Sequence, residues 1–145
     1  MECDAPCRAA PGIYAAGDVA SWHNPHFGTR MRLEHRINAT QQAMAAVGNL
    51  LGDAKPFAPV PYFWTDQYDT RIQAYGVIPP DTDMRIVHGD PVDGYFTTAH
   101  GHHRRVVGVF GWNTPPARYA RCVAWSSNAR RGRPSRSYPR SARQP

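Results

Sequence analysis

The sequence predicts an α+β fold in which a strand-plus-helix segment precedes a small antiparallel sheet. Two changes along the chain indicate this. Over 34–51 apolar residues recur at spacings of three and four, which is typical of a helix. Beyond the proline-rich stretch 53–61 the apolar residues alternate with a period of two, which is typical of strands. We therefore expect domains at 1–55 and 56–125, followed by a basic, disordered tail at 126–145.

The first predicted element is a short buried strand that begins at Ile13 and runs into Gly17-Asp18-Val19. Glycine lets the backbone pass close to a flat ligand, because no side chain stands in the way. The carboxylate of Asp18 can accept hydrogen bonds from ligand hydroxyls, each contributing roughly 1.5–3 kcal/mol. An alternative is a structural aspartate that caps the next turn. The following stretch, 21–28, contains Pro, Gly and Asn and is predicted to be a loop.

A helix is predicted from about Glu34 to Leu51, with Gly52 as its C-terminal stop. The spacing places the helix start soon after Asp18, so its free amides and positive dipole end are expected to face the same ligand. Several alanines favour the helical state. One stripe of the helix is expected to be its core face, formed by Ile37, Gln41, Met44, Val47 and Leu51.

The second half of the chain is predicted to form four antiparallel strands. Gly101–His103 forms the expected turn between the last two strands, and Ala117–Trp125 is a candidate helix. From Ser126 onward there are too few apolar residues to offset the entropy of ordering, so we expect disorder. The strands are expected at Thr70–Gly76, Met84–His88, Tyr95–His100 and Arg105–Trp112.

The positive charge is confined to the end of the chain. The net charge is +6, but eight of the 17 basic residues follow Ala117, where there is no acid. The rest carries nine basic residues against 11 acids, so a nucleic-acid partner is not expected. The chain has neither an apolar run of about 18 residues nor a signal-peptide core, which predicts a cytoplasmic protein without a membrane partner.

The cysteines and clustered histidines do not indicate a metal site. Cys3, Cys7 and Cys122 include no Cys-x-x-Cys pair. We expect Cys3 and Cys7 to be reduced thiols in an ill-ordered terminus, with a bridge between them as the alternative. The histidines at 100, 102 and 103 are expected at a hairpin tip without a cysteine or carboxylate partner, which favours adventitious binding only.

Three motifs in order carry a family resemblance: Pro11–Ala20, Arg32–Gln42 and Pro61–Asp69. Together they resemble the C-terminal part of FAD-dependent ferredoxin reductases of the putidaredoxin reductase and rubredoxin reductase type. The resemblance covers residues from about 10 to about 120. It implies that the first part ends an FAD-binding Rossmann-like domain and that the second is a reductase C-terminal domain. No Gly-x-Gly-x-x-Gly pyrophosphate fingerprint occurs, so a fragment of a longer protein is expected.

The resemblance also implies which residues face the cofactor. Asp18 would contact the ribityl chain, and the backbone amide at Arg36, where the family usually has tryptophan, would contact the flavin ring. Trp64 would shield the hydride path, the alternative being a core tryptophan at a domain boundary. His35 would orient the site without acid–base work, and no catalytic residue is expected. The predicted cofactor-binding residues are Gly17, Asp18, Val19, His35, Arg36 and Trp64.

The implied function is electron transfer. NADH or NADPH would reduce FAD, and the flavin would pass electrons to a ferredoxin or rubredoxin that serves an oxygenase or cytochrome P450. The isolated chain is expected to be inactive. The alternative is a non-enzymatic truncated remnant or an interaction module.

Overall fold

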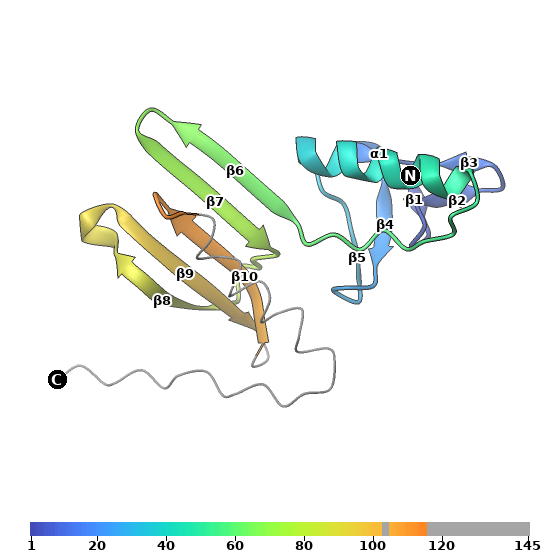
Figure 1. Ribbon diagram of the computed structural model, residues 1–145. Helices are drawn as coiled ribbons and strands as arrows, with labels where there is room; N and C mark the ends of the chain where they lie inside the picture. The colour runs from blue at the N-terminus through green and yellow to red at the C-terminus, as the bar shows by residue number, and fades with distance from the viewer. Residues whose placement is uncertain (103–104, 116–145) are drawn as a thin grey trace.

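The computed structural model describes residues 1–102 and 105–115. Two groups of elements lie side by side, joined by the connector 53–61 (Figure 1). We call residues 1–61 the N-terminal unit. It contains a single α-helix beside a three-stranded sheet and a two-stranded hairpin, whereas the second group is one larger sheet. No helix in the described part of the chain is long and apolar enough to cross a membrane. The cytoplasmic location stays a prediction.

The N-terminal unit is built from short strands around one helix. A three-stranded sheet has the order β1-β4-β5, with β1 parallel and β5 antiparallel to β4. A separate hairpin pairs β2 with β3. The elements are β1 (Glu2–Cys3), β2 (Arg8–Ala10), β3 (Ile13–Tyr14), the 3₁₀ turn η1 (Gly17–Val19), β4 (Ser21–Asn24), β5 (Thr29–Met31) and α1 (Arg36–Leu50).

Three predictions for the strands and the N-terminus of this unit are wrong. The expected loop 21–28 begins with strand β4, because Trp22 and Asn24 are completely buried there and only 25–28 form the turn. The N-terminus is ordered, because β1 pairs with β4, and both Cys3 and Cys7 are buried and free. These pairings join residues about 20 positions apart, which local periodicity does not reveal. The prediction that the strand at Ile13 is buried also fails, since this side chain is 52% exposed.

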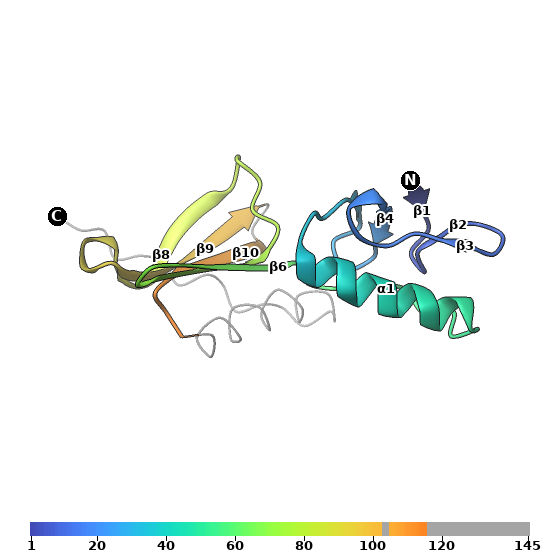
Figure 2. The ribbon, with the colours of Figure 1, turned by 90° about the horizontal axis from the view of Figure 1, so that it is seen from above.

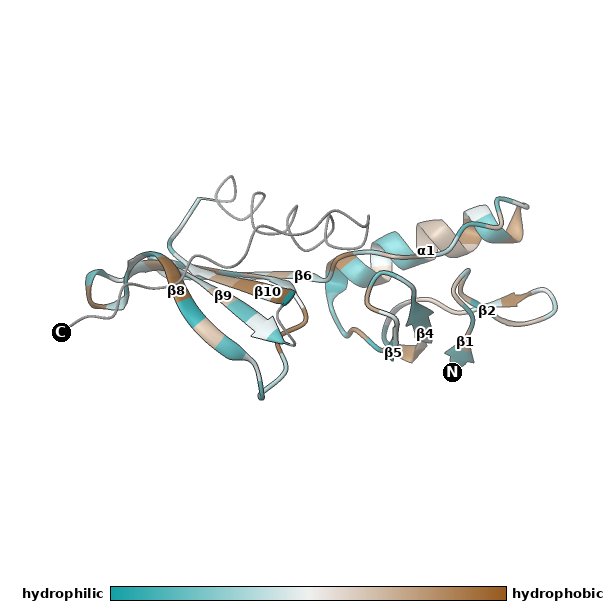
Figure 3. Cartoon of the chain, turned by 90° about the horizontal axis from the view of Figure 1, so that it is seen from below, coloured by the Kyte–Doolittle hydropathy of each residue, from teal (hydrophilic) through white to brown (hydrophobic). Residues whose placement is uncertain are grey.

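The helix has nearly its predicted bounds, but the face that it buries differs from the predicted one. It ends at Leu50, and Gly52 follows with φ of +109°, as expected for a stop. However, Met44 and Leu51 of the predicted core stripe are 72% and 81% exposed. In Figure 3 the brown of hydrophobic residues is visible at the C-terminal end of α1. The face that is buried instead carries Asn38, Gln42, Ala46 and Asn49.

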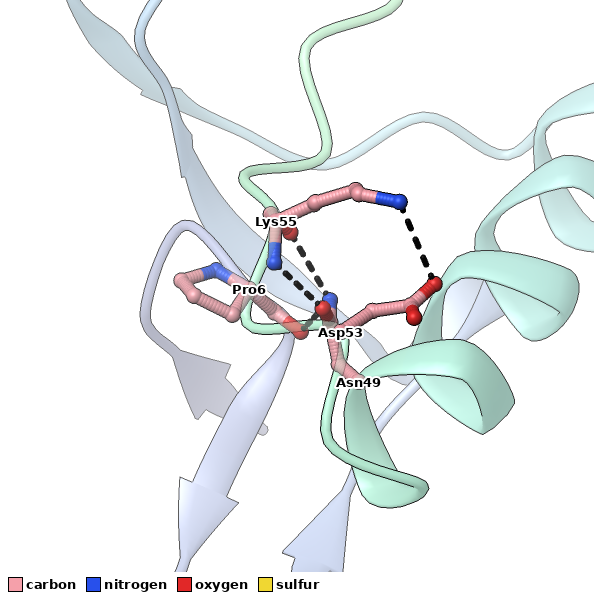
Figure 4. Close-up of polar contacts among 4 residues, drawn as sticks. All are labelled: Pro6, Asn49, Asp53 and Lys55. Atoms are coloured by element: carbon pink, nitrogen blue, oxygen red, sulfur yellow. Dashed lines mark hydrogen bonds and ion pairs between the residues drawn. The ribbon is translucent and has the colours of Figure 1, made fainter.

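Amides occupy the buried face because the neighbouring backbone needs hydrogen-bond partners. At the C-terminal end of α1, the Asn49 Nδ2 donates to the carbonyls of Pro6 at 2.8 Å and Lys55 at 2.9 Å. The Lys55 amide donates back to Asn49 Oδ1 at 2.7 Å (Figure 4). An apolar side chain at this position would leave these backbone groups unpaired, which costs about 1–3 kcal/mol each.

The connector is packed onto the N-terminal unit rather than free. Phe57 is buried against Trp22, with ring centroids 5.5 Å apart, and the Trp22 indole donates to the Phe57 carbonyl at 3.0 Å. The Asn24 amide donates to the carbonyl of Pro59 at 2.9 Å. These contacts fix the point at which the chain enters the second sheet. The core is formed by Cys3, Cys7, Ala15, Ala20, Trp22, Met31, Ala46 and Phe57.

The second sheet is antiparallel and has the strand order β6-β7-β10-β9-β8. The ranges of β7 and β10 are confirmed, and β8 and β9 extend beyond their predicted ends. Gly101 and His102 therefore belong to β9 rather than to a turn. Strand β6 was not among the strands expected from the sequence. The strands are β6 (Tyr62–Gln67), β7 (Thr70–Gly76), β8 (Asp83–Asp90), β9 (Tyr95–His102) and β10 (Arg105–Trp112), with a 3₁₀ turn η2 (Pro91–Asp93).

Three expectations concern the end of the chain. Cys122, the candidate helix 117–125 and the basic tail 126–145 lie outside the described residues, as does His103. Within the described part, no group of three or more His, Cys, Asp or Glu side chains is arranged to hold a metal ion.

His100 lies inside β9 rather than at a hairpin tip. Its Nδ1 is 3.3 Å from the Thr82 hydroxyl, and its Nε2 is 3.0 Å from the Thr98 hydroxyl. Thr82 uses its single hydroxyl hydrogen on the carbonyl of Pro79 at 2.9 Å, so His100 Nδ1 must donate and Nε2 must accept. Desolvation by burial lowers the pKa of His100 below its ordinary value. The neutral imidazole thus holds the segment 77–82 to the sheet.

We predict that this histidine makes folding stability depend on pH. Because the folded pKa lies below the unfolded value of about 6.5, the unfolded chain binds the proton more readily. The free energy of unfolding should fall as the pH decreases from about 6.5 toward the folded pKa. Urea unfolding of His100→Gln should show a smaller slope over this range. His23→Gln, which changes an exposed histidine, should keep the original slope, and equal slopes for all three proteins would contradict the prediction.

Candidate functional site

A pocket of about 350 Å³ lies where the start of α1 meets β6. Figure 2 shows the two elements beside each other at this point. Pockets for small ligands have volumes of about 300–1,000 Å³, so this one has room for a single ring system. One wall is Glu34, His35, Arg36 and Ile37, and the other is the strand segment 62–66.

The helix wall presents backbone donors that have no partner within the helix. His35 is the N-cap residue, with extended backbone and no capping hydrogen bond from its side chain. The first helical hydrogen bond runs from the Ala39 amide to the His35 carbonyl at 3.0 Å. The amides of residues 36–38 therefore have no intrahelical partner. Among the described residues, His35 Nδ1 also has no hydrogen-bond partner, although it is buried. This end of the helix carries about half a positive charge and suits an anionic group or an acceptor.

The strand wall is aromatic, and its side chains alternate across β6. Phe63 packs on the His35 ring with centroids 5.5 Å apart. Trp64 instead stacks on Tyr62 at 5.6 Å with an angle of 12° between the rings. Tyr62 in turn stacks on Tyr75 of β7 at 4.3 Å. Thus the ring that packs on His35 is that of Phe63, whereas the Trp64 ring stacks on Tyr62, although both residues line the pocket.

The turn η1 lies against the second turn of α1. Gly17 has φ of +74°, and a Cβ at this position would lie 3.3 Å from the Cβ of Ala39. Both features favour glycine. Asp18 is exposed, and its carboxylate makes no hydrogen bond within the described residues. Val19 is 53% exposed. The turn thus presents a free carboxylate beside the helix.

The structure brings together three of the six predicted cofactor-binding residues. His35, Arg36 and Trp64 line one pocket. The turn 17–19 packs on the same helix but does not line that pocket. Sequence reasoning gave no role to Phe63 or Gln42. If 62–67 had been predicted as a strand, the alternation of its side chains would have placed Phe63 and Trp64 on opposite faces. No local signal in the sequence indicates a role for Gln42.

The part of the chain that contains the second sheet matches a known protein family. Residues 62–130 match the family model described as Reductase C-terminal. This match confirms the resemblance to the C-terminal part of the ferredoxin reductases, which the three sequence motifs predict.

Individual relatives agree with this assignment. Over 111 residues the chain is 38% identical to the 5,5'-dehydrodivanillate O-demethylase ferredoxin reductase subunit of Sphingobium, a match covering 75% of this chain and 27% of the relative. It is 40% identical over 98 residues to the ferredoxin–NAD(+) reductase component of the anthranilate 1,2-dioxygenase system of Burkholderia cepacia, covering 67% and 24%. The chain thus spans about a quarter of the length of these relatives.

Solved structures give the same result. A ferredoxin reductase of a CYP system from Rhodopseudomonas palustris is similar with a TM-score of 0.70 and 32% identity, covering 78% of this chain and 28% of that chain. A covalent putidaredoxin reductase–putidaredoxin complex gives a TM-score of 0.76 at 22% identity, covering 88% and 30%. The similarity to this complex shows a shared fold alone.

We predict that Phe63 supports the start of α1. Phe63→Ala removes the ring packed on His35, so the Ala39 amide, which bonds to the His35 carbonyl, should exchange with solvent about fivefold faster. Trp64→Ala is the matched control, because Trp64 stacks on Tyr62 instead. Hydrogen exchange followed by NMR measures both variants. Equal acceleration of the Ala39 amide in the two variants would refute the assignment.

Proposed function

We propose that this chain supplies part of the FAD site of a reductase that passes electrons from NADH or NADPH to a ferredoxin or rubredoxin. One observation carries the proposal: the uncapped start of α1 opens into a pocket with an aromatic wall, and the Gly17–Val19 turn packs on the same helix. The named functions of the relatives support it, among them a rubredoxin-NAD(+) reductase that is 34% identical over 84 residues.

The residues present fit the flavin part of FAD. The pocket accommodates one ring system, and the free amides of residues 36–38 match the electron-rich pyrimidine edge of a flavin. Reduced flavin carries negative charge near this edge, and a helix N-terminus stabilises such charge by about 0.3–1 kcal/mol at an exposed site. The described part of the chain thus offers a place for the ring and no cradle for the pyrophosphate.

Bound FAD supplies the redox chemistry, since it accepts a hydride from the nicotinamide and gives up electrons singly. The protein orients and shields the ring. In this proposal the Arg36 amide donates to the ring edge, and His35 orients the helix start through its contact with Phe63. Trp64 keeps water from the ring face, and Asp18 accepts hydrogen bonds from ribityl hydroxyls. None of these residues acts as an acid, base or nucleophile.

The domain division belongs to the same proposal. Residues 1–55 would complete an FAD-binding domain, and residues 56–125 would form the sheet domain on which a small iron–sulfur partner docks. The sheet contributes β6 to the wall of the candidate pocket. An electron carrier docked there would lie close to the ring.

We predict that the purified 145-residue chain does not retain FAD, because the pocket is too small for a dinucleotide and the sequence has no Gly-x-Gly-x-x-Gly fingerprint. The visible absorption of the desalted protein should show no flavin. Stoichiometric FAD after desalting would overturn this expectation.

We also predict the effect of Asp18 in a graft that replaces the matching stretch of the Burkholderia cepacia reductase component with this chain. The grafted protein should bind FAD, and Asp18→Ala should raise the dissociation constant about tenfold, which corresponds to about 1.4 kcal/mol. Flavin fluorescence quenching measures the constant.

Asp53→Ala is the matched control for this graft, since it removes an exposed carboxylate after the opposite end of α1. It should leave FAD binding unchanged. An unchanged FAD dissociation constant for Asp18→Ala would indicate that Asp18 has a structural role instead. A graft that folds but stays colourless would favour the remnant or interaction module.

A further inference from the structure

We propose that Gln42 is a positioning residue of the candidate site, which holds the Gly17–Val19 turn against α1 and thereby keeps Asp18 in place. The inference rests on the proposed function as far as the ligand is concerned. The positioning itself depends only on contacts within this chain.

Gln42 lies in the middle of α1 with none of its surface exposed. Its Oε1 accepts a hydrogen bond from the Gly17 amide at 3.0 Å and another from Asn38 Nδ2 at 3.3 Å. Its Nε2 is 3.6 Å from the sulfur of Cys7 and donates to it. The side chain thus uses both ends of its amide in the protein interior.

The network extends from Gln42 to the start of the helix. The Asn38 amide that donates to Gln42 also donates to the carbonyl of Leu33 at 3.3 Å. Leu33 lies two residues before the N-cap residue His35. A short chain of side-chain amides therefore links the turn at Gly17 with the segment that leads into the pocket. These are the two segments to which the proposal assigns the cofactor.

The turn depends on Gln42 because the residue of the turn that contacts α1 is Gly17, which has no side chain. Gly17 must lack a side chain, since its φ is +74° and a Cβ would press on Ala39. Its buried amide has Gln42 as its hydrogen-bond acceptor. Asp18 and Val19 are exposed and cannot anchor the turn in the interior. A donor left without a partner in this position favours opening of the turn.

The experiment measures amide hydrogen exchange in the full 145-residue chain. In Gln42→Leu the Gly17 amide should exchange at least tenfold faster, and the amide shifts of Asp18 and Val19 should move. Gln42→Glu keeps an acceptor oxygen at the same reach, so it should retain most of the protection at Gly17. This rescue by an acceptor would not occur if Gln42 only filled space.

Asn49→Leu is the matched control. Asn49 is a buried amide of the same helix, two turns from Gln42, and it bonds to Pro6 and Lys55 instead of the turn (Figure 4). The Asn49→Leu substitution should loosen the connector and leave the exchange rate of the Gly17 amide unchanged. Equal protection of Gly17 in wild type and Gln42→Leu would overturn the proposal, as would the same loss of protection in Gln42→Leu, Gln42→Glu and Asn49→Leu.

A second measurement relates the network to the ligand. In the graft described above, Gln42→Leu should raise the FAD dissociation constant about tenfold, whereas Asn49→Leu should not. A graft with wild-type Gln42 that fails to bind FAD would refute the proposed function alone, because the exchange experiment still decides the positioning. Normal FAD affinity in a Gln42→Leu graft would refute the role of Gln42 toward the ligand.

Discussion

The pairing of buried side-chain amides with backbone groups is the interaction on which the rest of this structure depends. Helix α1 directs Asn38, Gln42 and Asn49 inward, and each bonds to backbone outside the helix. A net contribution of about 0.5–1.5 kcal/mol per hydrogen bond is modest, but each partner left buried and unpaired would cost more than that. The helix therefore has one favourable orientation, and its apolar residues Met44 and Val47 remain on the surface.

The orientation of α1 determines where the functional groups lie. The start of the helix opens toward β6, and the turn at Gly17 packs on its second helical turn. The connector completes this arrangement, because Trp22 and Asn24 hold it at Phe57 and Pro59. The chain then enters β6 at a fixed point, and Phe63 reaches the ring of His35. The pocket is thus a consequence of hydrogen bonds formed elsewhere in the N-terminal unit.

Much of the fold could be predicted because it depends on local pattern. The helix over 36–50 and the strands β7 and β10 follow from periods of 3.6 and two, which the chain shows clearly. The strands β1 and β4 could not be found in this way. Each is short, and their pairing brings Cys3 beside Trp22 from a distant part of the chain. The core stripe of the helix was predicted wrongly because hydropathy alone does not count hydrogen-bond partners.

The sequence by itself determined the three motifs through which the chain resembles the ferredoxin reductases, because the residues of each motif and their order can be read along the chain. It predicted that a short strand runs into Gly17-Asp18 and that a helix begins soon after Asp18. Only the tertiary structure decided that Gln42 joins these two segments and that Phe63 contacts His35. Both facts depend on which buried donors and acceptors meet across the fold, and that is settled only when distant segments pack together.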